Sequence, residues 1–405
     1  MTNKDLRLSK SQIDTHEQCP RKWFLKYAYG GAGIEPDGLR SMDLSKGVAI
    51  HKGIERLFAG DSIDAALTAA FAEFDADLAQ DKVAAGVTPV GVITENKMVV
   101  EACLRLWNQV RLPALRAEYD YVAGEYEMTT RLSDTLSLYA RPDAVLRSKQ
   151  DGRLFNWSLK TERSHNTTKH PTALIDTGGL TEAINMAMVM ADGELMRVGG
   201  TLMEYVVAGR PDDDEPIIWH PGVHGWRRPT DMGGFAYAWR WKFANPDHDL
   251  NGPKGPKNPE TRSLAKKEGW ERFNACDYPG GIAAWCDALL ARKFTPQHLD
   301  PRDELFYFPP AYVRTQSALL SFVEQTIAEY SGIPTRVERV ANGQASVDAA
   351  FPKRRYNCLR YGAEWRCPYW AICHEGLNNP IGNGFRLHRK RDEAAAEPPE
   401  TIETE

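Results

Sequence analysis

Long apolar runs, a basic excess and abundant cysteine are all missing from this 405-residue sequence. No run approaches the about 18 apolar residues that a membrane helix needs, so we expect no membrane partner. The opening residues, MTNKDLRLSKSQ, contain no apolar signal-peptide core, which predicts a cytoplasmic protein. The net charge of −5 excludes a chain that is basic throughout, so any binding of nucleic acid requires a local basic surface.

Several short motifs are also missing. The sequence has no helix-turn-helix or zinc-finger spacing, which argues against extensive readout of base sequence. It has no GxxxxGK[ST] phosphate loop, so it contains no ATP-driven motor of its own. What it does have is 42% hydrophobic and 26% charged residues, a balance typical of a globular protein with a buried core. The length suits one large domain or two ordinary ones.

Cysteines are few but unevenly placed. Three of the seven, Cys358, Cys367 and Cys373, fall within sixteen residues near the end of the chain. Cys19 lies far upstream in a similar Cys-Pro context, EQCPRKW. In a cytoplasmic protein structural disulfides are rare, so clustered cysteines indicate metal ligands or a reactive thiol.

Hydrophobic periodicity predicts an order of elements. Helices are expected over residues 47–60, 62–82, 96–118, 178–193 and 316–330, and a further helix begins after Ser9 and is interrupted at Cys19. Alternating segments predict three sequential antiparallel strands at 121–132, 136–148 and 153–162, and another strand at 197–210.

Two of these strands carry polar residues suited to catalysis. Asp143 follows Arg141-Pro142 in the second strand, and Lys160 lies in the third. An aspartate and a lysine on neighbouring strands can share one face, where the carboxylate binds Mg²⁺ or Mn²⁺ and the lysine orients a water. His51, on an upstream helix, adds an imidazole ligand. Taken singly, such a histidine is more often structural, and Arg-Pro-Asp is more often a turn.

Taken together, these residues resemble a known family. The motifs SQIDTHEQCPRKWFLKY, GVAIHKGIE, ARPDAV, WSLKTE and NCLRYGAEWRCPYWAIC occur in the order seen in the PD-(D/E)XK nuclease superfamily, in its RecB/AddB-like branch with an iron–sulfur cluster. The resemblance implies an α/β fold with a restriction-endonuclease-like core: a central mixed sheet flanked by helices, with a helical N-terminal region and insertions. It implies one nuclease domain over residues 1–380, with core motifs at 47–207, an excursion at about 208–300, and a C-terminal helix and cysteine segment at 311–375. The remaining residues, 381–405, are basic and then acidic and are expected to be a disordered tail.

The same resemblance implies a function and assigns roles. It implies a bacterial or phage-encoded, cytoplasmic or nucleoid-associated DNA exonuclease, a metal-dependent hydrolase acting in recombination, repair or phage DNA processing, with any helicase or recombinase as a separate partner. His51 and Asp143 take the roles of Mg²⁺ or Mn²⁺ ligands, and Lys160 is the catalytic lysine. The cluster ligands are Cys19, Cys358, Cys367 and Cys373. Four thiolates satisfy a [4Fe–4S] cluster, and they equally satisfy Zn²⁺.

One position departs from the family pattern. Two residues before the lysine the family has Asp or Glu, whereas this chain has Ser158, and a hydroxyl does not replace an anionic ligand of a hard dication. Glu162, two residues after Lys160 on the same strand face, is the first candidate for a displaced acid. Glu182 and Glu125 are the alternatives. If none substitutes, the protein is a degenerate nuclease fold that binds DNA or assembles with partners without cutting.

A basic, aromatic segment offers a DNA-binding surface. PKRRYNCLRYGAEWR interleaves cations with Tyr356 and other aromatic residues, so that cations neutralise phosphates while rings stack on unpaired bases. The predicted contacts are Lys353, Arg354, Arg355 and Arg360. The alternative is an ordinary solvated charged face.

Overall fold

The computed structural model describes most of the chain and divides it into two compact units. Unit 1 comprises residues 1–38, 128–140 and 315–405, and unit 2 comprises residues 39–127 and 141–314. The single domain expected over 1–380 stays a prediction, and each unit is described by itself. The described residues are 6–37, 42–79, 90–162, 176–208, 217–220, 223–226, 237–241, 270–274, 280–284, 306–307, 310–358 and 366–387.

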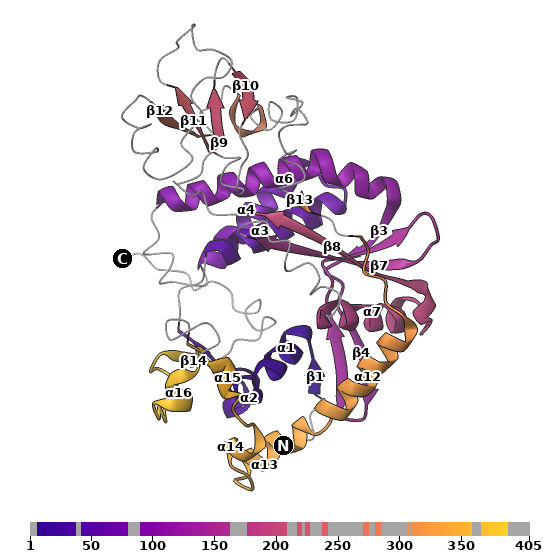
Figure 1. The fold of residues 1–405 in the computed structure, drawn as a ribbon, viewed down its shortest axis with the longest axis vertical. Coiled ribbons are helices and arrows are strands. Elements are labelled where there is room, and N and C mark those ends of the chain that lie inside the picture. The colour runs from indigo at the N-terminus through magenta and orange to yellow at the C-terminus, as the bar shows by residue number, and fades with distance from the viewer. Residues whose placement is uncertain are drawn as a thin grey trace, which may run out of the picture. The chain divides into compact units, whose positions relative to one another are not determined.

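Unit 2 is built on a mixed five-stranded sheet (Figure 1). In spatial order its strands are β13 (Phe306–Tyr307), β8 (Val198–Val207), β7 (Leu154–Glu162), β6 (Ala144–Ser148) and β3 (Tyr119–Gly124). Strands β7 and β8 are parallel, and the other neighbours are antiparallel. A parallel pair requires a crossover, and the helix between β7 and β8 provides it. The predicted mixed sheet is therefore confirmed.

Helices cover both faces of this sheet. Three of them, α3 (Met42–Phe58), α4 (Ile63–Ala79) and α6 (Val90–Glu118), share one apolar core with the sheet residues Ala144, Leu146, Trp157, Leu159 and Val206. Side chains alternate along a strand, so the even-numbered residues of β7 point to the other face. There α7 (Thr177–Met190), followed by the short 3₁₀ helix η3 (Leu195–Arg197), lies against the sheet (Figure 1). The flanking helices confirm the predicted restriction-endonuclease-like α/β fold.

A second sheet in unit 2 falls inside the predicted excursion. Its order is β10 (Val223–Trp226), β9 (Ile217–His220), β11 (Tyr237–Trp241) and β12 (Trp270–Asn274). Strands β11 and β12 form an antiparallel pair, and β9 runs parallel to β11.

Unit 1 joins the beginning of the chain to a hairpin from its middle. Strand β1 (Leu6–Leu8) pairs in parallel with β5 (Leu136–Ala140), which pairs with β4 (Met128–Ser133). Helices α1 (Lys10–Gln18) and α2 (Pro20–Tyr27) follow β1, with the short helix η1 (Tyr29–Gly31) after them. The predicted interruption at Cys19 is confirmed: its backbone is extended, and Pro20 begins α2, where the missing N–H costs no hydrogen bond.

The rest of unit 1 comes from the end of the chain. Helix α12 (Gln316–Tyr330) has the predicted limits and is capped by the Thr315 hydroxyl. It is followed by α13 (Ile333–Ala341), α14 (Val347–Ala350), α15 (Arg355–Cys358) and α16 (Trp370–His374). Phe351 stacks on Trp23 and Phe24 of α2. Strand β14 (Phe385–Leu387) pairs with β2 (Ile34–Pro36), so the prediction of a disordered tail from residue 381 is wrong for these three residues.

Two of the predicted strands are wrong in their extent. The segment 121–132 is divided between β3 and β4, and the segment 136–148 between β5 and β6, with the halves in different sheets. The second break falls at Arg141 and Pro142. Proline lacks the N–H that a strand interior needs, which makes this a natural place for the chain to leave one sheet and enter another. Asp143 therefore stands immediately before a strand, and not in the middle of one.

Candidate active site and cysteine cavity

Asp143 and His51 meet at the start of β6, within unit 2. The Nδ1 atom of His51, on α3, lies 3.1 Å from Oδ1 of Asp143. Gly47, one helical turn before His51, allows α3 to approach the sheet closely: a Cβ at this position would lie 2.7 Å from the hydroxyl of Thr161 on β7. The second oxygen of Asp143 accepts the backbone N–H of Leu159 at 2.7 Å. Helix and strand thus fix both oxygens of one carboxylate.

The electrostatic surroundings keep Asp143 ionised. Burial alone would raise its pKa, but His51, Lys160 and the N–H of Leu159 outweigh burial and lower the pKa below its usual value. A permanently anionic carboxylate that accepts hydrogen bonds from an imidazole and a backbone amide is a suitable ligand for a hard divalent cation.

Ser158 and Lys160 lie directly beside this carboxylate. Ala144 pairs with Trp157 in the antiparallel register, so the next pair along the two strands sets Asp143 opposite Ser158. Lys160 is on the same strand face as Ser158 and donates from Nζ to the serine hydroxyl at 2.9 Å. The structure therefore brings His51, Asp143 and Lys160 together, with a neutral side chain at the position where the family pattern has an acid.

Glu125 approaches the same place from the end of β3. Its backbone N–H donates to the carbonyl oxygen of Asp143 at 3.3 Å, and its carboxylate lies 2.9 Å from Nε of Arg141. Burial raises the pKa of Glu125, and the nearby acids Asp143 and Glu55 add to the rise. The cation Arg141 and His51 oppose it. Glu55 lies one turn after His51 on α3. The roles of Arg141 and Glu55 were missed in the sequence, although Arg141 belongs to the ARPDAV motif and Glu55 follows His51 at helical spacing.

The other two candidate acids are placed differently. Glu162 ends β7, four residues beyond Ser158, a separation of roughly 13 Å along an extended strand. Glu182, on α7, accepts a hydrogen bond from Asn156 at 2.5 Å, and Asn156 lies two residues before Ser158 on the same face. The proposed role of Glu162 stays a prediction.

The comparisons with known proteins agree with this geometry. Residues 7–192 match the sequence model of the PD-(D/E)XK nuclease superfamily, a span that contains His51, Asp143, Ser158 and Lys160. This part of the chain belongs to the PD-(D/E)XK nuclease superfamily. No curated protein gives a significant match to the sequence. The matched family consists of nucleases, which hydrolyse phosphodiester bonds and typically use Mg²⁺ or Mn²⁺. Among the described residues no helix is long and apolar enough to span a bilayer.

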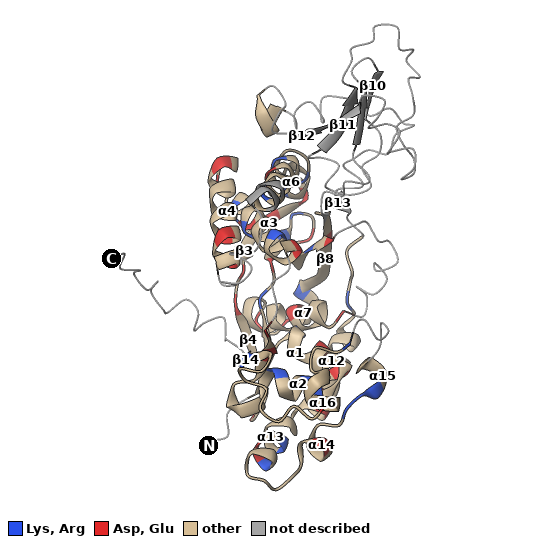
Figure 2. Ribbon diagram, turned by 90° about the vertical axis from the view of Figure 1, so that its left-hand side faces the viewer, with Lys and Arg blue, Asp and Glu red and all other residues tan. Residues whose placement is uncertain are grey.

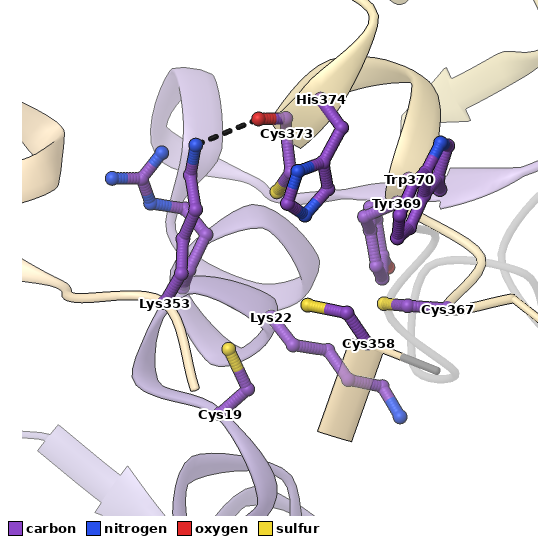
Figure 3. Close-up of a pocket in the computed structure, with 10 residues that line it drawn as sticks. Cys19, Lys22, Lys353, Cys358, Cys367, Tyr369, Trp370, Cys373 and His374 are labelled. Atoms are coloured by element: carbon purple, nitrogen blue, oxygen red, sulfur yellow. Dashed lines mark hydrogen bonds between the residues drawn. The ribbon is translucent and has the colours of Figure 1, made fainter. Parts of the chain in front are cut away.

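The four predicted cluster cysteines, three of which lie outside the matched span, line one cavity of unit 1 (Figure 3). Cys19 enters from the junction of α1 and α2, and Cys358 from the end of α15. Cys367 precedes α16 and Cys373 lies within it. The backbone N–H of Cys367 donates to the carbonyl of Cys358 at 3.0 Å, which holds the two C-terminal arms of the cavity together.

Burial raises the pKa of three of these thiols. It raises the pKa of Cys373 to about 11 and the pKa of Cys358 and Cys367 above their usual value, and neighbouring cysteines add to the rise in each case. Among the residues that the structure describes, no three His, Cys, Asp or Glu side chains are arranged as a complete set of metal ligands. The donor set nevertheless suits a thiophilic metal, because four sulfur atoms converge on one cavity and thiolates are the preferred ligands of iron–sulfur clusters and zinc.

Basic residues of the predicted DNA surface divide into two groups. Lys353 donates to the carbonyl of Cys373 at 2.6 Å, and Arg354 donates from its guanidinium to the carbonyl of Glu17 and from its backbone N–H to the Cys19 sulfur. Arg354 thus ties the cysteine segment to α1 and to Cys19, whereas Lys353 links two parts of the C-terminal segment. By contrast, Arg355 is exposed at α15, where Figure 2 shows basic residues, and Tyr356 beside it is 85% exposed. Arg360 lies outside the described residues.

Proposed function

We propose that this protein is a metal-dependent DNA exonuclease of the RecB-like kind that acts in recombination, repair or phage DNA processing. The observation that carries the proposal is the placement of Asp143, whose two oxygens are held by His51 and by the backbone of the lysine-bearing strand. Any helicase or recombinase that works with it is a separate chain.

The residues have distinct tasks in this proposal. Asp143 and His51 would hold a Mg²⁺ or Mn²⁺ ion, which when bound would supply polarisation of the scissile phosphate and a lowered pKa of an attacking water. Lys160 positions that water from the neighbouring strand, and its ammonium stabilises negative charge that develops on the phosphate oxygens. A third ligand comes from a nearby carboxylate, for which Glu162, Glu182 and Glu125 are the candidates.

A cleavage assay on the full chain tests the proposal. Linear single- and double-stranded DNA, labelled at one end, would be incubated with the purified protein in Mg²⁺, Mn²⁺ or a chelator. We expect metal-dependent release of short products from an end. A covalently closed circle of the same sequence is the control, because an exonuclease leaves it intact. Absence of cleavage of every substrate with either metal would contradict the proposal.

A second candidate function rests on Ser158. Its hydroxyl accepts a hydrogen bond from Lys160, where a carboxylate would otherwise pair with the lysine and bind metal. On this alternative the protein is a DNA-binding or assembly subunit that retains the nuclease fold. The natural protein then fails to cut DNA, and Ser158→Asp creates cleavage by returning the anion to its family position.

We also propose that the cysteine cavity holds a structural [4Fe–4S] cluster, supported by Cys19, Cys358, Cys367 and Cys373 lining one cavity. The cluster joins the two ends of unit 1 and does not take part in hydrolysis. Anaerobically purified protein should be brown, absorb near ~410 nm and contain about four irons per chain, as thiolate-bound iron–sulfur clusters do. A colourless protein with one zinc ion per chain would replace the cluster with structural zinc.

A further inference from the structure

The candidate active site is one carboxylate short at the position of Ser158. Asp143 and His51 alone supply one negative charge to a dication, whereas tight sites for Mg²⁺ and Mn²⁺ in proteins use more carboxylate ligands. Any compensating acid must lie beside Asp143, because ligand oxygens of one ion are separated by only about 3 Å. Three acids compete for this role, and the backbone distinguishes them.

Glu125 is the acid whose backbone is tied to Asp143. The hydrogen bond from its N–H to the carbonyl of Asp143 places the two residues side by side across β3 and β6. Glu125 also has a φ of +49°, and besides Asp192 it is the sole non-glycine residue with positive φ among those described. Such left-handed backbone is costly for a side-chain-bearing residue and persists where the surroundings enforce it. At Glu125 it turns the side chain at the very end of the strand.

The contacts of Glu125 fit a ligand that waits for a cation. Its carboxylate is about one-third exposed and pairs with Arg141, only two residues before Asp143. It is close enough to Asp143, Glu55 and His51 to interact electrostatically with each of them. Arg141 thus supplies a positive charge that offsets the mutual repulsion of these acids.

Glu162 and Glu182 lie farther from the centre of the site. Glu162 is separated from Ser158 by four residues of extended strand, beyond the part of β7 that pairs with β6. Glu182 is occupied by Asn156, which itself accepts a hydrogen bond from Thr201 at 2.9 Å, so this carboxylate belongs to a buried polar network between α7 and the sheet.

We propose that Glu125 is the second carboxylate ligand of the active-site metal and that Arg141 is its positioning residue, which holds the carboxylate until a divalent cation displaces it. The proposal rests on the proposed function, since it concerns the metal of that same site. On this proposal, the acid that is missing at Ser158 on β7 is replaced by Glu125 at the end of β3, on the other side of Asp143.

Binding of Mn²⁺ to the full chain tests this inference independently of cleavage. Free Mn²⁺ would be measured by electron paramagnetic resonance in titrations of the parent, Glu125→Gln, Asp143→Asn and Glu162→Gln. We expect the Glu125 and Asp143 variants each to lose about tenfold or more in affinity, because each removes one anionic ligand. Glu162→Gln tests the competing assignment of this ligand to Glu162: the inference expects its affinity to stay within about twofold of the parent, and a tenfold loss there would overturn the inference in favour of Glu162. If Glu125→Gln binds Mn²⁺ as tightly as the parent while Asp143→Asn binds it more weakly, the inference is overturned but the proposed metal site is not.

Two further variants extend the test, and the first of them, Arg141→Gln, keeps the inference testable if Glu125→Gln does not fold. Arg141→Gln removes a cation that competes with the metal, so Mn²⁺ affinity should rise about threefold or more. A purely structural role for Arg141 predicts no such rise, and unchanged or weaker binding overturns the proposal. Ser158→Asp in the Glu125→Gln background should restore most of the lost affinity. If the parent itself binds no Mn²⁺, the proposed metal-dependent function fails together with the inference.

Discussion

The candidate active site takes its polar groups from residues 51 to 160, whereas the cysteine cavity joins residue 19 to residues 358–373. The first is fixed by strand register and one helix contact between neighbouring elements. The second requires closure of a loop of more than 300 residues, which carries a large entropy cost for the cysteines that meet there. A bound metal offsets that cost, since metal binding to such a site is coupled to folding. Loss of metal should therefore affect the two regions differently.

Their protonation differs as well. The pKa of Asp143 is lowered, so the active site presents an anion at neutral pH. The pKa values of Cys358, Cys367 and Cys373 are raised, so these thiols lose their protons less readily than free cysteines do. Mg²⁺ should bind reversibly at the first site, and metal insertion at the second should release protons.

The largest expected effect is at Asp143. Asp143→Asn should lower metal-dependent cleavage by about a hundredfold or more, because it removes the anion that His51 and Leu159 position for the metal. Fold and DNA affinity should change little, since phosphate contacts are spread over many cations. End-labelled DNA assays and a binding assay in chelator measure the two properties. Unchanged cleavage in rigorously purified variant protein would refute the assignment.

A second variant affects the other region. Cys367→Ala should release the proposed metal, lower the melting temperature and make residues 366–387 sensitive to protease. Cys103→Ala is the matched control, because Cys103 is fully buried in the core of unit 2 and away from the cavity. It should lose stability through a small void but retain all metal. Iron and zinc analysis together with limited proteolysis distinguishes the two variants. Full metal content in Cys367→Ala would exclude Cys367 as a ligand.

A third effect is pH-dependent and confined to unit 1. His16 is buried between the rings of Trp23 and Tyr330, and it faces Glu329 on α12, Arg336 on α13, and Arg354. Burial, aided by the two arginines, lowers its pKa to about 4 from an ordinary value of 6.5. The unfolded chain therefore binds a proton between those pH values while the folded chain does not, and stability is lost as the pH falls from 6.5 to about 4.

Replacing the imidazole tests this linkage. His16→Phe should reduce the loss of unfolding free energy on the acid side by about 3 kcal/mol, the free energy that corresponds to a pKa lowered from 6.5 to about 4. Tyr330→Phe is the control, since it alters the same packing without removing the titrating group. Thermal melts between pH 7 and 4 provide the measurement. Parallel declines for His16→Phe and the parent would show that another group controls the acid transition.

The smallest expected effect is at the exposed basic surface. Arg355→Ala should weaken DNA binding a few-fold and reduce the salt dependence of the binding constant by about one ion. Arg339→Ala, on the exposed side of α13, removes the same charge elsewhere on unit 1 and should leave both quantities nearly unchanged. Fluorescence anisotropy over a salt series measures them. Equal effects of the two variants would indicate general electrostatics without a defined surface.

Sequence patterns predicted elements whose signals are local. Helix α12 has the predicted limits because its apolar periodicity starts at a Thr315 cap. His51, Asp143 and Lys160 were found because they are short motifs in a fixed order. The sequence also showed that Ser158 departs from the family, since that is a property of a single position.

Other features depend on partners far away in the chain. Pro142 is a local signal for a break in a strand, but nothing local shows that the chain enters a different sheet after Pro142 or at Glu125. That choice depends on β1, which pairs with β5 from more than a hundred residues away. The ion pair of Glu125 with Arg141 depends on these same breaks and could not be predicted. Glu162 was therefore the first candidate, because its spacing from Lys160 is visible in the sequence.

The pairing of β2 with β14 has a consequence for biosynthesis. Residues 34–36 leave the ribosome long before their partner strand at 385–387 is made. The described elements of unit 2 lie between residues 42 and 307, so they are complete before α12 emerges. Unit 2 can therefore fold during synthesis, whereas α1, α2 and Cys19 wait for the C-terminal segment. A chain whose synthesis terminates before Cys358 would retain the sheet of unit 2 and the pairing of β1 with β5, but it would leave β2 and Cys19 without their C-terminal partners and exposed to chaperones and proteases.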